Sequence, residues 1–118
     1  MKKVVKFGGS SLASAEQFKK VGDIIRADEG RRYVVPSAPG KRNSADTKVT
    51  DMLYQCYALA EKGEAFATQL AAIKDRYVSI LNGLSMPENL LDEEFVTISE
   101  NFRKRFGSDY AASRGEYL

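Results

Sequence analysis

The residues that could do chemistry begin close to the first position, in the run Lys6-Phe7-Gly8-Gly9-Ser10. A lysine and two glycines stand between an apolar stretch, typical of a short buried strand, and serine hydroxyls that a helix is expected to follow. Glycines have no Cβ atom, so backbone N–H groups can approach an anion closely, and the lysine supplies the opposite charge. The motif therefore favours a phosphate-binding turn. An ordinary strand-to-helix turn with a solvated lysine is the alternative on this motif alone.

The elements that must position this turn are a strand, a helix and a second strand. The first strand is predicted over Lys3–Phe7. A capping box, formed by Ser14 and Gln17, predicts the start of a helix whose apolar positions recur with helical spacing. Gly30 is expected to end that helix.

The second strand is predicted to begin at Tyr33-Val34-Val35 and to end at Pro36, because proline cannot donate a hydrogen bond to a central ladder. Strand, helix and strand in this order imply a right-handed crossover and a parallel pair. Ligands of such sheets gather at the carboxyl ends of the strands. Because Lys6–Ser11 and Ser37–Lys41 both follow strand ends, we expect them to lie together, which favours a functional site.

Three amphipathic helices are predicted beyond the second strand. The first begins at a cap supplied by Asp46 or Thr47 and ends near Gly63, the second ends at Gly83, and the third ends near Gly107. Their apolar stripes are Val49, Met52, Leu53, Cys56 and Ala60, then Phe66, Leu70, Ile73, Tyr77 and Ile80, then Leu91, Phe95, Ile98, Phe102 and Phe106. The aromatic residues of these stripes are expected in the core rather than around a cofactor.

The last segment, Tyr110–Leu118, is also predicted to be helical, and the chain stops within it, which suggests truncation. Small residues beside the lone Glu116 predict a close-packed helix start with the carboxylate aimed at a specific group. On this segment alone, a surface glutamate near a frayed helix end is the favoured alternative.

Composition limits the classes of function. The 118 residues suffice for one modest domain, and 18 basic against 16 acidic residues leave a net charge of +2, which is no footprint for nucleic acid. The absence of histidine excludes histidine-based acid–base catalysis and histidine metal ligands. The single Cys56 allows no disulfide framework and favours a reducing, cytoplasmic setting. No apolar run is long enough to span a bilayer, so no membrane partner is expected.

Three blocks of the chain match a known pattern. Lys6–Leu12 has the form K-[FY]-G-G-[ST]-S, and Ser37–Lys41 has the form S-A-x-G, followed later by Val49-Thr50-Asp51 in the form [VT]-T-[DN]. Ser113–Glu116 carries a G-E pair. Together the blocks span nearly the whole chain and resemble the N-terminal part of the aspartokinases, members of the amino acid kinase family.

The resemblance implies an α/β fold, the N-terminal part of a carbamate-kinase-like three-layer sandwich with a parallel sheet nucleus and an extended helical segment. Residues 1–118 would be the amino-acid-substrate side of the kinase domain. The nucleotide-binding half and the regulatory ACT domains would be absent, so the fragment alone is expected to be inactive.

The activity that the resemblance implies is phosphoryl transfer from ATP, with Mg²⁺, to the β-carboxylate of L-aspartate, the first step of lysine, threonine and methionine biosynthesis. Lys6 would stabilise the transferring phosphoryl group, and Phe7–Ser10 would bind phosphate. Ser37 and Thr50 would hold the amino acid, and Glu116 would pair with its ammonium group. A carboxylate nucleophile needs no general base, so the lack of histidine is no obstacle. The parent enzyme would be a cytoplasmic homo-oligomer with no metal ligands in this segment.

Two departures leave alternatives open. Pro36 stands where many relatives continue the strand, and the stretch after Lys41 is longer than in the shortest relatives, so Thr47 competes with Thr50 for the substrate role. Thr50 is preferred because Asp51 follows it. Another amino acid kinase with a different acceptor, or a non-catalytic phosphate-binding or interaction module, is the alternative function.

Overall fold

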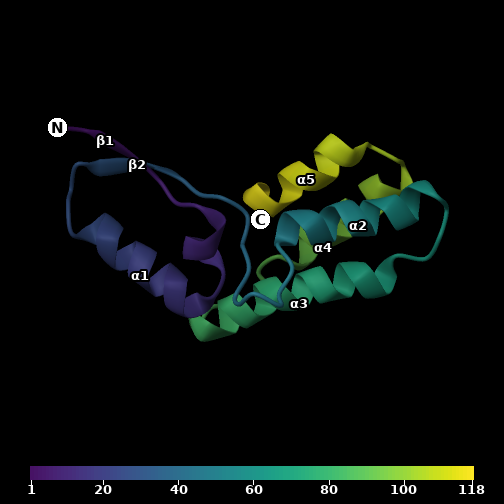
Figure 1. Cartoon of the computed structure of the whole chain (residues 1–118), viewed down its shortest axis with the longest axis horizontal. Helices are drawn as coiled ribbons and strands as arrows, with labels where there is room; N and C mark the ends of the chain where they lie inside the picture. The colour runs from purple at the N-terminus through teal and green to yellow at the C-terminus, as the bar shows by residue number, and fades with distance from the viewer.

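The computed structural model describes residues 1–118 and has an α/β part and a helical part side by side along its 50 Å axis (Figure 1). The α/β part contains β1 (Lys3–Lys6), a 3₁₀ turn η1 (Gly9–Leu12), α1 (Ala15–Arg26) and β2 (Arg31–Val35). The helical part contains α2 (Val49–Glu61), α3 (Ala67–Gly83), α4 (Asp92–Arg103) and α5 (Ser108–Tyr117). The predicted α/β class, with a small parallel sheet and an extended helical segment, is confirmed.

β1 and β2 pair in parallel, with Lys6 opposite Val35, as the strand–helix–strand order predicted. The predicted cap of α1 is present, since the Ser14 side chain accepts a hydrogen bond from the Gln17 N–H. One face of the strands packs on α1 through a small buried cluster of Phe7, Leu12 and Val21. This packing fixes the direction in which the first loop leaves the sheet.

The expectation of a buried first strand is wrong for this chain. β1 is mostly exposed, and Val4 keeps 71% of its surface accessible, while Tyr33 on β2 keeps 53%. Two strands with a single helix beside them have one covered face only, because no further element lies on the other side (Figure 1). The sheet therefore presents a bare apolar face, defined here by Val4, Tyr33 and Val35, which strand alternation and the register place on one side.

The core lies in the helical part, as the apolar stripes predicted. Thirteen buried residues form one cluster, and Phe102 at its centre makes edge-on ring contacts with Tyr57 and Tyr110. Cys56 is fully buried in this cluster, and burial raises the pKa of its thiol to about 11, so it stays protonated at neutral pH. The aromatic residues of the stripes are core residues, with the exception of Phe106.

Two predicted helix boundaries need correction. α2 has Lys48 at its N-cap rather than Asp46 or Thr47, and no side chain caps it, because Asp46 is engaged by Arg42 instead. α1 ends at Arg26 and not at Gly30, which lies in the turn that leads into β2.

Phe106 was predicted on the stripe of the third amphipathic helix, but it lies beyond the end of α4 and is exposed. The backbone reverses at Arg105, which takes a left-handed φ of 57°, and this reversal carries Phe106 out of the stripe. Gly63 after α2 does end its helix as predicted, with a φ of 74° that favours glycine.

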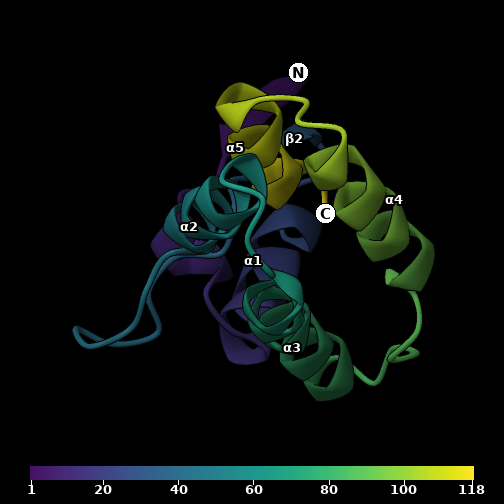
Figure 2. The ribbon, with the colours of Figure 1, turned by 90° about the vertical axis from the view of Figure 1, so that its right-hand side faces the viewer.

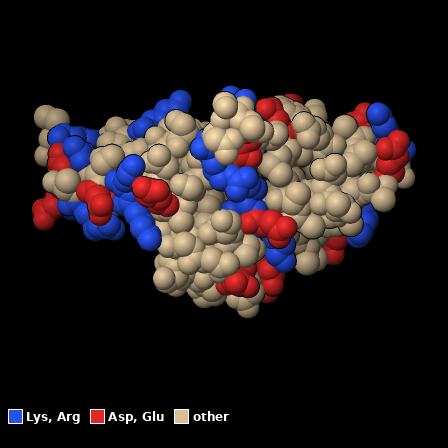
Figure 3. All heavy atoms as spheres, turned by 60° about the horizontal axis from the view of Figure 1, so that its bottom comes forward, with Lys and Arg blue, Asp and Glu red and all other residues tan.

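No helix of the chain has the length and apolar character that crossing a membrane requires. Figure 3 shows lysine and arginine side chains interspersed with acidic ones over one face of the molecule.

Candidate functional site

A depression of about 510 Å³ lies where the two strand-end loops meet the start of α2. Ser10 comes from the loop after β1, Ser37 from the loop after β2, and Thr50 from the first turn of α2. The lining residues are Gly9, Ser10, Ser37, Ala38, Pro39, Gly40, Lys41, Lys48, Thr50 and Asp51. The structure thus brings four of the predicted site residues, Gly9, Ser10, Ser37 and Thr50, into one hollow.

The two loops are held together by a contact between backbones. The Gly40 N–H donates a hydrogen bond of 2.8 Å to the Gly9 carbonyl oxygen. A Cβ atom on Gly40 would lie 2.6 Å from the Gly9 carbonyl carbon and 2.9 Å from the Ser10 nitrogen, so no larger residue fits without moving a loop. A Cβ on Gly8, by contrast, would meet no atom within 4 Å. Glycine at position 40 therefore allows the two loop backbones to pack closely, whereas the space around Gly8 is open to a ligand.

The N-terminus of α2 forms another part of the wall, through Lys48, Thr50 and Asp51. The Val49 N–H donates to the Pro39 carbonyl oxygen at 3.0 Å, which fixes the helix start against the loop after β2. The first turn of a helix carries N–H groups without helical partners and a partial positive charge, and both attract anions. Lys41 and Lys48 add two cations to the lining and Asp51 adds one carboxylate. The depression is therefore suited to an anionic group such as a carboxylate.

Sequence reasoning did not assign Lys41 and Lys48 to the site. Lys41 falls at the end of the predicted Ser37–Lys41 segment but was given no binding role, and Lys48 falls in none of the predicted site segments. The signal that could have found Lys48 is its place directly before the Val49-Thr50-Asp51 block, at a helix N-cap.

Lys6, Phe7 and Gly8 do not line the depression. Lys6 ends β1 with an exposed side chain, and strand alternation places it on the same bare face as Val4. Phe7 is buried against α1, and its N–H already donates to the Val35 carbonyl oxygen at 3.0 Å. Phe7 therefore cannot donate its N–H to a phosphate, and its role in phosphate binding would be to position the residues that follow it. The assignments of Lys6, Phe7 and Gly8 to phosphate stay predictions.

Glu116 lies apart from the depression and lines a neighbouring apolar cavity of about 350 Å³, which Ser37 also lines. The expectation of a helix start at Gly115-Glu116 is wrong, because both residues lie in the last turn of α5. Gly115 is needed there, since a Cβ atom on it would lie 2.7 Å from the Ala38 Cβ atom. α5 therefore packs directly on the loop that carries Ser37, and Glu116 is exposed beside it.

Tyr77 fixes α5 in this place. Its hydroxyl donates a hydrogen bond of 2.8 Å to the Gly115 carbonyl oxygen. Burial raises the pKa of the Tyr77 phenol well above its ordinary value, so the group remains a donor across the physiological range.

The two candidate threonines lie on different sides of the loop between β2 and α2. Thr50 lines the depression, whereas Thr47 lines a polar groove with Arg42, Asp46 and Arg76. This loop projects from the body of the molecule before it returns to α2 (Figure 2). The geometry favours Thr50 over Thr47 as the substrate contact, and the role itself stays a prediction.

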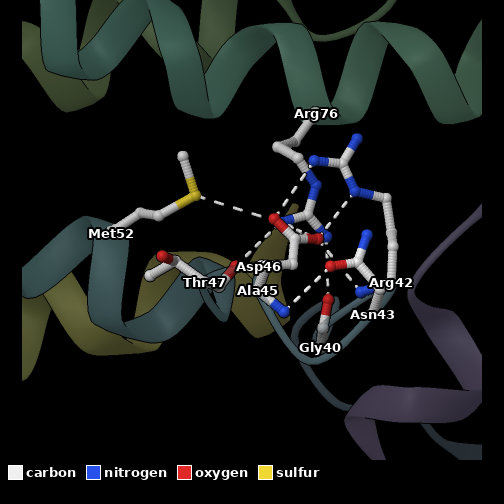
Figure 4. A network of polar contacts seen from close by, with 8 residues as sticks. All are labelled: Gly40, Arg42, Asn43, Ala45, Asp46, Thr47, Met52 and Arg76. Carbon is white, nitrogen blue, oxygen red and sulfur yellow. Dashed lines mark hydrogen bonds and ion pairs between the residues drawn. The ribbon is translucent and has the colours of Figure 1, made fainter.

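A buried arginine on α3 holds both ends of that loop (Figure 4). Arg76 is only 6% exposed and donates hydrogen bonds of 2.8 Å to the Gly40 carbonyl oxygen and 2.9 Å to the Thr47 carbonyl oxygen. Asp46 lies 3.6 Å from the same guanidinium. Sequence reasoning missed Arg76, although a charged residue on the buried side of a predicted helix, between Ile73 and Ile80, was a usable signal.

Asp46 is the second member of this network. It accepts hydrogen bonds of 2.7 and 3.1 Å from the Arg42 guanidinium and one of 3.0 Å from the Arg42 backbone N–H. These bonds hold the pKa of the Asp46 carboxyl well below its usual range. Desolvation lowers the pKa of Arg76, and the charge of Asp46 opposes that effect.

The chain contains no group of three or more His, Cys, Asp or Glu side chains that could hold a metal ion.

Comparisons with known proteins agree on one family. The profile of the amino acid kinase family matches residues 1–110. Aspartokinase 3 of Bacillus subtilis is 47% identical over 92 residues, which are 77% of this chain and 20% of that protein.

Solved structures give the same result. The crystal structure of Clostridium acetobutylicum aspartate kinase superposes with a TM-score of 0.91 at 46% identity, over 99% of this chain and 27% of that one. Escherichia coli aspartokinase III, solved in complex with aspartate and ADP, superposes with a TM-score of 0.72 at 28% identity, over 99% of this chain and 26% of that one. This chain thus spans about a fifth of the length of the curated relative and about a quarter of the solved structures.

Proposed function

Because this chain belongs to the amino acid kinase family, we propose that it forms the acceptor side of an aspartate kinase. In the proposed reaction a β-carboxylate oxygen of L-aspartate attacks the γ-phosphorus of ATP, the bond from that phosphorus to the ADP oxygen breaks, and 4-phospho-L-aspartate and ADP leave. No proton has to be removed from a carboxylate nucleophile, so the reaction needs positioning and charge neutralisation.

The observation that carries this proposal is the depression at the start of α2. Its hydroxyls, its two lysines and the N-terminus of the helix suit a ligand with carboxylates. Thr50 and Ser37 stand on opposite elements and can bind the same small molecule, since both line the one hollow. The 46% identity to an aspartate kinase across nearly the whole chain supports aspartate as that molecule.

In the proposal Lys6 and Glu116 act from outside the depression. Lys6 stands at the end of β1 on the bare face, where it can neutralise charge on a phosphoryl group that arrives from that side. Glu116 lies across the Ser37 loop and would pair with the substrate ammonium. Binding of ATP with Mg²⁺ is proposed for a longer aspartate kinase that contains this segment, supported by the Escherichia coli relative solved with ADP. A homo-oligomeric parent is likewise a proposal.

The activity can be tested in a chimera in which this chain replaces the matching segment of the Bacillus subtilis aspartokinase, to which it is 47% identical. We expect ADP release that depends on L-aspartate and not on L-glutamate or other carboxylate acceptors. The chimera with Ser37→Ala and Thr50→Val is the matched control, and it should no longer release ADP in response to aspartate. ADP release with a different acceptor, in a chimera that folds, would contradict aspartate as the substrate.

A further inference from the structure

The strongest unassigned feature is the contact of one buried guanidinium with both ends of the loop between β2 and α2. Gly40, at the first end, packs on Gly9 and lines the depression. Thr47, at the second end, directly precedes Lys48, which lines the depression from the α2 side. Arg76 donates to the carbonyl oxygens of both Gly40 and Thr47 and lies outside the depression itself.

We propose that Arg76 is a positioning residue for the acceptor site, because its guanidinium holds the two ends of this loop, and with them the two walls of the depression, at a fixed separation. This inference rests on the proposed function for its consequence in catalysis. The two hydrogen bonds that form the clamp do not depend on that function.

Arginine suits this role in a way that lysine does not. Its planar fork offers donors in two directions, and here separate nitrogens reach separate carbonyl oxygens at 2.8 and 2.9 Å. A lysine ammonium is a single point and cannot span both oxygens with the same geometry. Burying a charge is unfavourable unless it is fully paired, and Arg76 at 6% exposure is held by two carbonyl oxygens and Asp46.

The network provides its own control. Arg42 is about half exposed and bonds Asp46 from the solvent side, but it makes no bond to the Gly40 or Thr47 carbonyl. Arg42→Gln therefore weakens the outer half of the network and leaves the clamp on the loop ends. If Arg76 positions the acceptor site, a substitution of Arg76 must disturb that site and Arg42→Gln must not.

The first test uses hydrogen exchange on the 118-residue chain. The amides of Gly40 and Val49 bond across the loop to Gly9 and Pro39, so they report whether the two ends stay in place. In Arg76→Lys and Arg76→Met we expect both amides to exchange at least about tenfold faster, as for the loss of one charge-assisted contact. Amides within α3 should keep their rates in these two variants, and the Gly40 and Val49 amides should keep theirs in Arg42→Gln. Unchanged loop amides, or equal acceleration throughout α3, would overturn the clamp.

The second test uses kinetics in the chimera described above. In Arg76→Lys the KM for aspartate should rise by about tenfold, with the KM for ATP unchanged, and Arg42→Gln should leave both values near the parent. Arg76→Ala should regain part of its aspartate affinity when guanidinium ion is added at concentrations that do not denature. Equal changes in both KM values, or no rescue, would show that Arg76 is only structural. If the unsubstituted chimera does not phosphorylate aspartate, the proposed function fails, while the exchange result still decides the clamp.

Discussion

The contact between Gly40 and Gly9 allows a sharp test of how the site is assembled. Gly40→Ala would place a Cβ atom 2.6 Å from the carbonyl carbon, 2.8 Å from the carbonyl oxygen and 2.9 Å from the next nitrogen of the other loop. All three atoms belong to the backbone, so no side chain can rotate away and a loop must move.

The cost can be estimated from two contributions. Overpacking a tight site typically costs about 1–3 kcal/mol of unfolding free energy. Moving the loop also breaks the hydrogen bond from the Gly40 N–H to Gly9, which contributes about 1 kcal/mol. We therefore expect Gly40→Ala to lower the free energy of unfolding by about 2–4 kcal/mol, and the urea midpoint to fall by roughly 1 M or more.

Gly8→Ala is the matched control, because a Cβ on Gly8 meets nothing within 4 Å and its φ of −77° is open to alanine. The control should change stability by less than about 0.5 kcal/mol, or raise it slightly through the unfolded state. Urea unfolding of the 118-residue chain, followed by far-UV circular dichroism, measures both variants. If the two alanine variants unfold at the same urea concentration, the two loops are not locked through Gly40 and our account of the site geometry fails.

Four further predictions follow from the site. Thr50→Val in the chimera should raise the KM for aspartate, with a loss of roughly 1–3 kcal/mol in binding free energy, and Thr47→Val should raise it less. The reverse order would show that Thr47, and not Thr50, contacts the substrate. Lys6→Ala should lower kcat by about a hundredfold with little change in aspartate KM, as measured by coupled ADP release. Turnover within a few-fold of the parent would show that Lys6 is a solvated surface lysine with no catalytic role. Asp46 has a lowered pKa, so its stabilising contribution is present above the unfolded pKa of ~4 and is lost as the pH falls through the folded value. The melting temperature of Asp46→Asn should therefore fall less on acidification than that of the parent chain. An equal fall in both chains would contradict this role of Asp46. Val35→Lys on the bare sheet face should reduce self-association of the isolated chain in sedimentation experiments, because exposed apolar strands tend to associate; an unchanged association state would exclude that face.

The elements that sequence predicted well are those with a local cause. The Ser14 cap, the turn at Gly63 and the apolar stripes from Leu53 to Phe102 each follow from spacing along a short stretch of chain. The meeting of Ser10 with Ser37 could also be predicted, since both follow the ends of parallel strands.

The parts that could not be predicted depend on contacts between distant segments. Arg76 finds its carbonyl partners 29 and 36 positions earlier in the chain, and nothing local indicates such a pairing. The residue type and position of Asp46 are typical of a helix cap, but its carboxylate instead accepts a bidentate pair of hydrogen bonds from Arg42. The first strand was predicted to be buried because of its apolar composition, yet burial depends on which elements cover a strand, and here only α1 does.

The most direct test of the central claim is a crystal structure of the chimera with L-aspartate and ADP bound. We expect aspartate in the depression at the start of α2, with a carboxylate within hydrogen-bond distance of Thr50 and with Ser37 also in contact with the ligand. Aspartate bound elsewhere, with the depression holding no part of either ligand, would contradict it.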